Sequence, residues 1–177
     1  MTNRQSGFSK CTSFYLLICI ILVQSIALNQ KTSSSELNLV SGLNSLDKKY
    51  MEAQKSLVDE FARSMGQSFN GDVDHDIELL QLLLDSKKIK NNMTPELQAM
   101  GFVLGDLLAN ELDMHWVIYK DHVGRSRALR YKRSNNFLFP VTMISRRREV
   151  NNLTSVAKIY EKAFNSISPL RDPLPFN

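Results

Sequence analysis

The chain has 177 residues, of which 43% are hydrophobic and 23% are charged, and its formal net charge is +4. These proportions are those of ordinary globular proteins and exclude a disordered or fibrous chain. The basic side chains are unevenly spread, because residues 28–110 carry 8 basic and 12 acidic side chains whereas residues 111–177 carry 12 and 6. So small an overall excess does not indicate nucleic-acid binding.

The first 27 residues have the pattern of a signal peptide. Arg4 and Lys10 are the only charges in this stretch, and both precede the apolar run 14–23. An apolar run of about ten residues is typical of a secretory leader and is shorter than the roughly 20 residues that cross a bilayer. Ser25 and Ala27 supply the small residues that a signal peptidase requires, so we expect cleavage after position 27.

Export predicts a location outside the cytoplasm, which in a bacterium is the periplasm or the exterior of the cell. The alternative is an uncleaved inner-membrane anchor that faces the periplasm, because residues 24–28 can lengthen the apolar segment. Both cysteines, Cys11 and Cys19, lie within the leader. The mature domain of about 150 residues therefore has no thiol for a disulfide, a metal site or nucleophilic catalysis.

A long helix is predicted at the start of the mature chain. Residues 28–35 form a polar linker whose serines can cap a helix that starts near Glu36. From Leu39 to Met65 apolar residues recur at steps of three, four and seven, which predicts one amphipathic helix. Gly66 is placed to end it.

Two further helices follow. Residues 70–72 predict a turn, after which Asp74 can cap a leucine-rich helix. Thr94, with a proline directly after it, marks the start of the third helix. Gly101, Gly105 and Ala109 lie four residues apart on one side of this helix, so another backbone can approach closely there.

The pattern then changes from helical to alternating. Residues 116–120 and 126–131 predict two strands of a hairpin, with Gly124 in the loop between them. Residues 137–141 predict a third short strand. Helices followed by strands, instead of alternating with them, indicate an α+β fold: about four helices packed on a small three-stranded antiparallel sheet.

The last predicted helix is amphipathic and is capped by Asn151 or Asn152. Three prolines then break the chain into a tail over residues 169–177. We therefore expect one α+β domain over residues 36–168, because about 150 residues suffice for one hydrophobic core only.

Several short motifs stand in an order that is found in a known family. They occupy residues 96–101, 104–108, 116–117, 124–125, 128–130, 138–140 and 143–147. Through them the chain resembles, over roughly residues 46–164, the bacterial family called domain of unknown function 3806. The resemblance implies a small α+β domain and carries no agreed activity.

No residue cluster specifies a reaction. The sequence contains no GxSxG segment, no phosphate-binding glycine loop, no dinucleotide fingerprint and no HExxH pair, so we expect neither a metal site nor a cofactor. An enzymatic alternative rests on carboxylates and a histidine near the helix-to-strand junction. Its candidate catalytic residues are Asp106, Glu111, Asp113 and His115.

The most informative cluster is basic and aromatic. It lies on the predicted hairpin and on a second basic run after the third strand. The candidate binding residues are Trp116, Tyr119, Arg125, Arg127, Arg130, Tyr131, Arg146 and Arg147. Arginine and aromatic side chains anchor protein interfaces, and arginine holds carboxylate or phosphate in bidentate pairs. The same arginines can instead form salt bridges with the acidic helical half of the chain.

These observations predict an exported, non-enzymatic binding protein. Its arginine-rich hairpin would recognise an acidic protein partner or an anionic component of the cell envelope, and an immunity or inhibitor protein is one form of this function. We expect no nucleic-acid partner, and membrane contact only through an uncleaved N-terminal segment. An enzyme of unfamiliar type and a membrane-tethered structural module are the alternatives.

Overall fold

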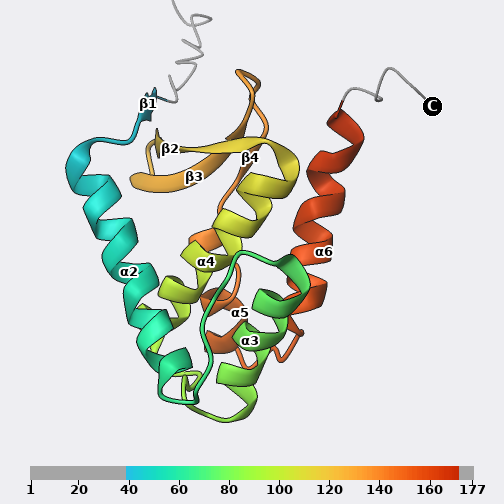
Figure 1. The fold of residues 1–177 in the computed structure, drawn as a ribbon. Helices are drawn as coiled ribbons and strands as arrows, with labels where there is room; N and C mark the ends of the chain where they lie inside the picture. Colours follow the sequence, from blue (N-terminus) through green and yellow to red (C-terminus); the bar gives the residue numbers. More distant parts are fainter. Residues whose placement is uncertain (1–38, 172–177) are drawn as a thin grey trace, which may run out of the picture. The chain divides into compact units, whose positions relative to one another are not determined.

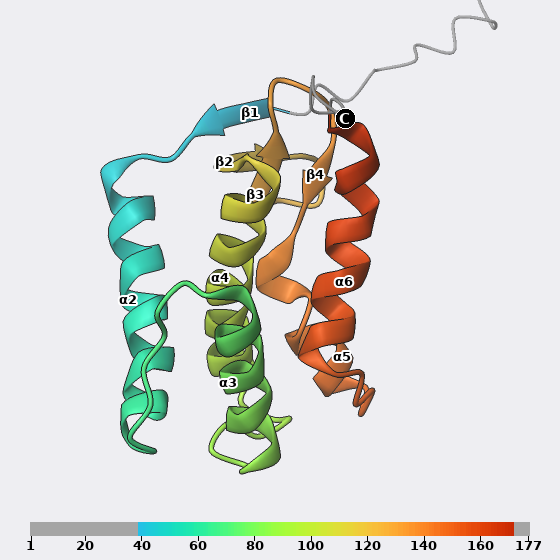
Figure 2. The same cartoon turned by 45° about the vertical axis from the view of Figure 1, so that its right-hand side comes forward.

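The computed structural model describes residues 39–171 (Figures 1 and 2). In chain order the elements are β1 (Leu39–Gly42), α2 (Ser45–Arg63), α3 (Val73–Asp85), α4 (Thr94–Leu112), β2 (Met114–Lys120), β3 (Arg125–Tyr131), β4 (Phe137–Leu138), the 3-10 turn η1 (Pro140–Thr142), α5 (Ser145–Glu149), α6 (Val156–Ile167) and the 3-10 turn η2 (Ser168–Leu170). The predicted α+β class is confirmed. The described part has five α-helices and four strands, one more of each than we expected.

Helix α4 is the central element of the fold. It is apolar on most of its surface, and eleven of its residues are buried, which is typical of a helix covered from several sides. Figures 1 and 2 show α2 and α6 on opposite sides of α4, with α3 beside it and the strands near one end of the helices. The sheet has the order β1-β2-β3-β4, and every neighbouring pair is antiparallel.

The helix predicted from near Glu36 starts later than expected. Residues 39–42 instead form β1, an edge strand in which Leu39 pairs with Lys120 of β2. Asn44 ends this extended stretch and caps α2: its side chain accepts a hydrogen bond from the Asp47 amide, and the Asp47 carboxylate accepts one from the Asn44 amide. This reciprocal capping box fixes the helix start at Ser45.

Three other boundaries differ by a few residues from the predicted ones, two of them because another side chain makes the cap. Asp72, and not Asp74, accepts the hydrogen bond from the amide at the start of α3. Ser155 caps α6 three residues after Asn152. The third predicted strand is cut to two residues because η1 begins at Pro140.

The predicted approach of another backbone to α4 is confirmed at Gly101, whereas side chains fill the space beside Gly105. A Cβ atom on Gly101 would lie 2.6 Å from the Pro140 carbonyl oxygen and 2.6 Å from Cα of Val141, so η1 packs directly on the α4 backbone. A Cβ atom on Gly105 would overlap the ring of Trp116. Both contacts require glycine and bring β2 and η1 against α4.

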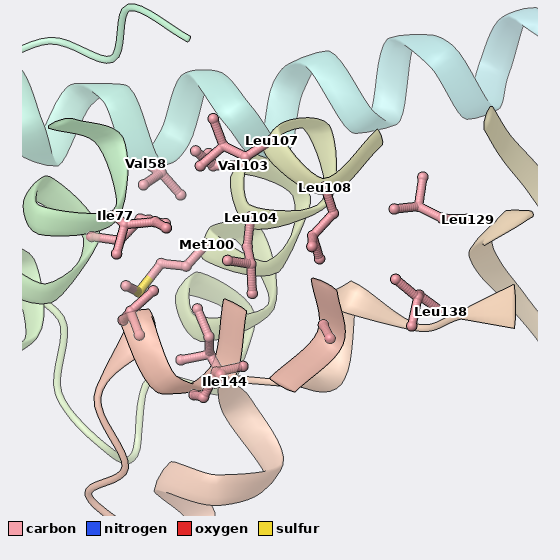
Figure 3. Close-up of a cluster of buried hydrophobic side chains, with 14 of the residues drawn as sticks. Val58, Ile77, Met100, Val103, Leu104, Leu107, Leu108, Leu129, Leu138 and Ile144 are labelled. Atoms are coloured by element: carbon pink, nitrogen blue, oxygen red, sulfur yellow. The ribbon is translucent and has the colours of Figure 1, made fainter. Parts of the chain in front are cut away.

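The core lies around α4. Figure 3 shows Leu104 of α4 among Val58 of α2, Ile77 of α3, Leu129 of β3 and Ile144, which precedes α5. Burial of such side chains contributes about 1.5–3 kcal/mol each relative to exposure. The core therefore fixes the hairpin, η1 and α2 relative to α4, and these are the elements that form the candidate site.

The predicted leader (residues 1–27) and linker (residues 28–35) lie outside the described residues, as do residues 172–177 of the predicted tail. Between residues 39 and 171 no helix is long and apolar enough to cross a bilayer.

Candidate functional site

A groove of about 470 Å³ opens between the β2–β3 hairpin, α2, α4 and the segment that runs from η1 into α5. Its charged lining residues are Arg125, Arg127, Arg146 and Asp121, and its large aromatic ones are Tyr50, Phe102 and Phe139. We call it the arginine groove. Its volume lies in the range of about 300–1,000 Å³ that is typical of ligand sites.

One wall of the groove is held by an ion pair between the hairpin and α2. Nη2 of Arg125 lies 2.7 Å from both carboxylate oxygens of Asp47, and Nη2 of Arg127 lies 3.0 Å from Asp47 Oδ1. The Asp47 side chain is only 4% exposed, whereas those of Arg125 and Arg127 are 44% and 22% exposed. A single buried carboxylate therefore positions two arginines at the edge of the groove.

The pKa of Asp47 is lowered. The hydrogen bond from Arg125 is the largest cause, and it outweighs the burial that opposes the charged form; the Asn44 amide and the charge of Arg127 act in the same direction as Arg125. Asp47 is therefore ionised throughout the neutral pH range, and both guanidinium groups stay anchored there.

Arg127 also packs on an aromatic ring. Its guanidinium carbon lies 4.2 Å from the centroid of the Tyr50 ring, at the distance of a cation–π contact. The Tyr50 ring in turn meets Phe102 edge to face, with 5.9 Å between centroids. These contacts hold Tyr50 in place although 43% of its surface is exposed.

Arg146 enters the groove from the other side, from α5. The described part of the chain provides its guanidinium with no ion pair and no hydrogen bond. The next residue, Arg147, does not line the groove, and its side chain donates to the Met143 carbonyl oxygen. Of these two predicted binding residues, the structure places only Arg146 in the groove.

The remaining predicted binding residues serve the fold. Arg130 donates to the carbonyl oxygens of Ser134 at 2.7 Å and Arg133 at 2.8 Å, and so closes the β3–β4 turn. Tyr131 is buried in the core. Tyr119 does not line the groove but contacts Phe139, which does, with 5.4 Å between ring centroids.

Trp116 and Asp106 belong to a second cluster, which meets the groove where the Trp116 ring packs against Phe102, with 5.7 Å between ring centroids. Nε1 of Trp116 donates to Asp106 Oδ1 at 2.8 Å, and Nζ of Lys55 lies 2.8 Å from Asp106 Oδ2 and 2.9 Å from Glu52. Burial opposes the charge on Lys55, but the hydrogen bonds to Asp106 and then Glu52 outweigh it, so the pKa of the Lys55 ammonium is raised. This cluster joins α2, α4 and β2.

Asp106 lines a second pocket of about 390 Å³, together with Glu52, Asp59, Asp76 and Lys55. The Asp76 side chain is buried and accepts hydrogen bonds from two backbone amides of the preceding turn, Asn70 and Gly71. The acidic groups of this pocket are therefore tied to protein donors at several points.

Of the four candidate catalytic residues, Asp106 alone lines one of the two pockets described above. Glu111, Asp113 and His115 are exposed and line neither pocket described above, and Asp113 forms the left-handed C-cap of α4. Among residues 39–171, no three His, Cys, Asp or Glu side chains are placed to hold a metal ion.

Sequence reasoning missed Asp47, Tyr50, Phe102 and Phe139 as parts of the site. Asp47 and Tyr50 lie in a helix about 75 residues before the hairpin, and their acidic and aromatic side chains match an ordinary amphipathic pattern. The sequence signal that could have found Asp47 is its place three residues after Asn44, the spacing of a capping box.

Comparisons with known proteins agree with this fold. A crystal structure from Bacteroides thetaiotaomicron VPI-5482 is similar, with a TM-score of 0.66 and 18% sequence identity. The match covers 77% of this chain and 51% of that chain, so the present chain spans about half the length of its neighbour. At this identity the likeness shows the fold alone. No curated protein matches the chain.

A family model described as "Domain of unknown function (DUF3806)" matches residues 76–160. This range is narrower than the stretch 46–164 over which the motifs indicate the resemblance. It contains every lining residue of the arginine groove except Tyr50. The resemblance inferred from the motifs is confirmed, because residues 76–160 of the chain match the model of the DUF3806 family.

Proposed function

We propose that the chain is a binding protein whose arginine groove receives an acidic segment of a partner protein. The observation that carries this proposal is the meeting of three guanidinium groups and partly exposed aromatic rings in one groove. Arginine and aromatic side chains are enriched at protein interfaces and supply most of their hot spots.

The charge of the groove favours an acidic partner. Asp47 balances one of the two hairpin arginines, and Asp121 accepts hydrogen bonds from the amides of Val123 and Gly124 within the hairpin loop. Arg146 has no acidic partner among the described residues. The positive charge that remains attracts carboxylates and speeds their association with the groove.

The hairpin wall of the groove is also organised before any ligand arrives. Arg125 is fixed by Asp47, and Arg127 is fixed by Asp47 and by stacking on Tyr50. Immobilising a long side chain on binding costs about 0.5–1.5 kcal/mol. Side chains that the fold already holds avoid much of this cost, so this wall suits a binding function.

The signal peptide predicted over residues 1–27 supports a partner outside the cytoplasm, and an immunity or inhibitor protein of the periplasm is one form of this function. We expect the mature protein to begin at Leu28. Mass spectrometry of the protein recovered from a periplasmic extract measures its N-terminus. Intact residues 1–27 in soluble cytoplasmic material would contradict export.

Charge reversal of Arg146 tests the binding function. Arg127 and Arg130 are poor targets, because each makes contacts that the fold uses. Arg146→Glu changes an exposed side chain that makes no ion pair in the described structure. Arg133→Glu is the matched control, since Arg133 is an exposed arginine outside the groove.

In this experiment the full-length chain is used to capture a partner from an envelope extract, and the captured protein is identified, purified and titrated by calorimetry. We expect Arg146→Glu to weaken binding at least about tenfold and Arg133→Glu to leave it unchanged. An acidic residue of the partner, changed to arginine, should restore binding to the Arg146→Glu variant. Equal affinities of the two variants would contradict the proposal.

A further inference from the structure

We infer that the arginine groove recognises a two-part motif, a side-chain carboxylate held by Arg146 next to an apolar or aromatic side chain seated against Tyr50 and Phe139. This inference rests on the proposed function and adds to it the chemistry of the bound segment. It follows from the unused donors of the groove, from its exposed rings and from its balance of charge.

The first part of the motif is set by Arg146. A guanidinium group carries five N–H donors in a planar fork that matches the two oxygens of a carboxylate. The described residues engage none of the donors of Arg146, although it lines the groove. Arg125 can offer further N–H donors to the same ligand, because only its Nη2 is bonded to Asp47 and its side chain is 44% exposed.

The second part of the motif is set by apolar side chains in the same lining. Tyr50, Phe139 and Val123 line the groove, and their exposed fractions are 43%, 37% and 81%. Each ring meets another ring edge to face, Tyr50 that of Phe102 and Phe139 that of Tyr119. An apolar side chain that covers two fixed rings gains buried area and aromatic contact without ordering the groove further.

The balance of charge favours a carboxylate over a phosphate. The three guanidinium groups of the groove carry three positive charges, and the carboxylates of Asp47 and Asp121 carry two negative charges. A single carboxylate neutralises the remaining charge. A phosphorylated side chain carries about −1.5 to −2 at neutral pH and would leave negative charge uncompensated.

Small capped dipeptides test this inference on the full-length chain. The probe is N-acetyl-Glu-Phe-amide, and its binding is followed by shifts of backbone amide signals in a ¹H–¹⁵N NMR spectrum. N-acetyl-Gln-Phe-amide removes the charge, N-acetyl-Glu-Ala-amide removes the ring, and inorganic phosphate tests the other anion. The variants are Arg146→Gln and, as control, Arg133→Gln.

We expect N-acetyl-Glu-Phe-amide to shift the amides of groove residues such as Ser126 and Thr142 and to bind at least about tenfold more tightly than either altered dipeptide. In Arg146→Gln the preference for Glu over Gln should disappear, while Arg133→Gln keeps it. Signals outside the groove show that each variant is folded.

The inference would be overturned by equal affinity for the Glu and Gln probes, by a preference for Glu that survives Arg146→Gln, or by tighter binding of phosphate than of the Glu probe. Failure of all the dipeptides to bind would overturn it too. The proposed function would still stand in that case if Arg146→Glu abolished binding of an identified protein partner.

Discussion

Arg125 and Asp47 are 78 residues apart in the chain, yet one guanidinium nitrogen of Arg125 lies 2.7 Å from each carboxylate oxygen of Asp47. The same carboxylate completes the capping box with Asn44. One acidic side chain therefore fixes both the start of α2 and the hairpin wall of the arginine groove. Replacing Asp47 should therefore destabilise both the start of α2 and the hairpin wall.

Asp47→Asn should lower the free energy of unfolding by about 2–3 kcal/mol. Removing one partner of a buried ion pair costs about 3–5 kcal/mol, and the partial exposure of Arg125 and Arg127 to water reduces this loss. Equilibrium unfolding in urea, followed by circular dichroism, measures the change.

Asp59→Asn is the matched control on the same helix. Asp59 pairs with the exposed Arg63 one turn later, and such surface pairs contribute about 0.3–0.5 kcal/mol. If Asp47→Asn lowered the free energy of unfolding no more than Asp59→Asn does, the ion pair between Asp47 and the hairpin would not stabilise the fold.

The contribution of Asp47 should depend on pH only under acidic conditions. Its pKa lies below the ordinary value of 3.8, chiefly because of the hydrogen bond from Arg125 and against the effect of burial. A carboxyl group whose pKa is lower in the folded state stabilises the fold above its unfolded pKa, and this stabilisation is lost as pH falls through the folded pKa.

The difference in unfolding free energy between the wild type and Asp47→Asn should therefore be constant from pH 8 to about pH 5 and should shrink below about pH 4. Urea titrations at a series of pH values give this difference. A change centred between pH 5 and 7 would assign the dependence to another group.

The elements with local signals could be predicted from the sequence. The hairpin follows from alternation around Gly124, and the contacts of Gly101 and Gly105 follow from their spacing on α4. The segment 39–42 could not be assigned in this way. Its Leu39 fits a helical stripe, and it becomes a strand only because β2, which comes about 75 residues later, offers an edge.

The candidate site could be predicted only in part. Sequence reasoning selected Arg125, Arg127 and Arg146, which line the groove, but it also selected Arg130, which serves a turn. All four are arginines on or near the hairpin. They differ in which hydrogen-bond acceptor, if any, the described residues place within reach of the side chain. Asp47 is that acceptor for two of them. The capping box marks Asp47 locally, but no local pattern indicates its tertiary contact with the hairpin.

Gly101→Ala should destabilise the fold by about 1–3 kcal/mol, because the new Cβ would lie 2.6 Å from backbone atoms of Pro140 and Val141. In an exposed helix the same change would stabilise by about 1 kcal/mol, so the sign of the effect tests the packing of η1 on α4. Thermal unfolding measures it.

Gly42→Ala is the control for this prediction. A Cβ atom on Gly42 would meet nothing within 4 Å, so a change within about 0.5 kcal/mol is expected. If Gly101→Ala raised the melting temperature, the close approach of η1 to the α4 backbone would be wrong.

Arg148→Met should leave the free energy of unfolding unchanged or raise it. Arg148 is only 6% exposed, and its Nε has no hydrogen-bond partner among the described residues. Burying a charge without a counter-charge is costly, and apolar side chains of similar volume often replace buried ions with a gain in stability. Methionine keeps the aliphatic contacts of the side chain and removes the charge.

Arg130→Met supplies the contrast within the same protein. It removes the two hydrogen bonds that Arg130 donates to the carbonyl oxygens of Ser134 and Arg133, and we expect it to destabilise the fold by about 1–2 kcal/mol. Urea unfolding of both variants gives the comparison. A loss above about 2 kcal/mol for Arg148→Met would mean that its guanidinium group is held by an ordered water molecule or an anion, and the buried charge would then contribute to stability.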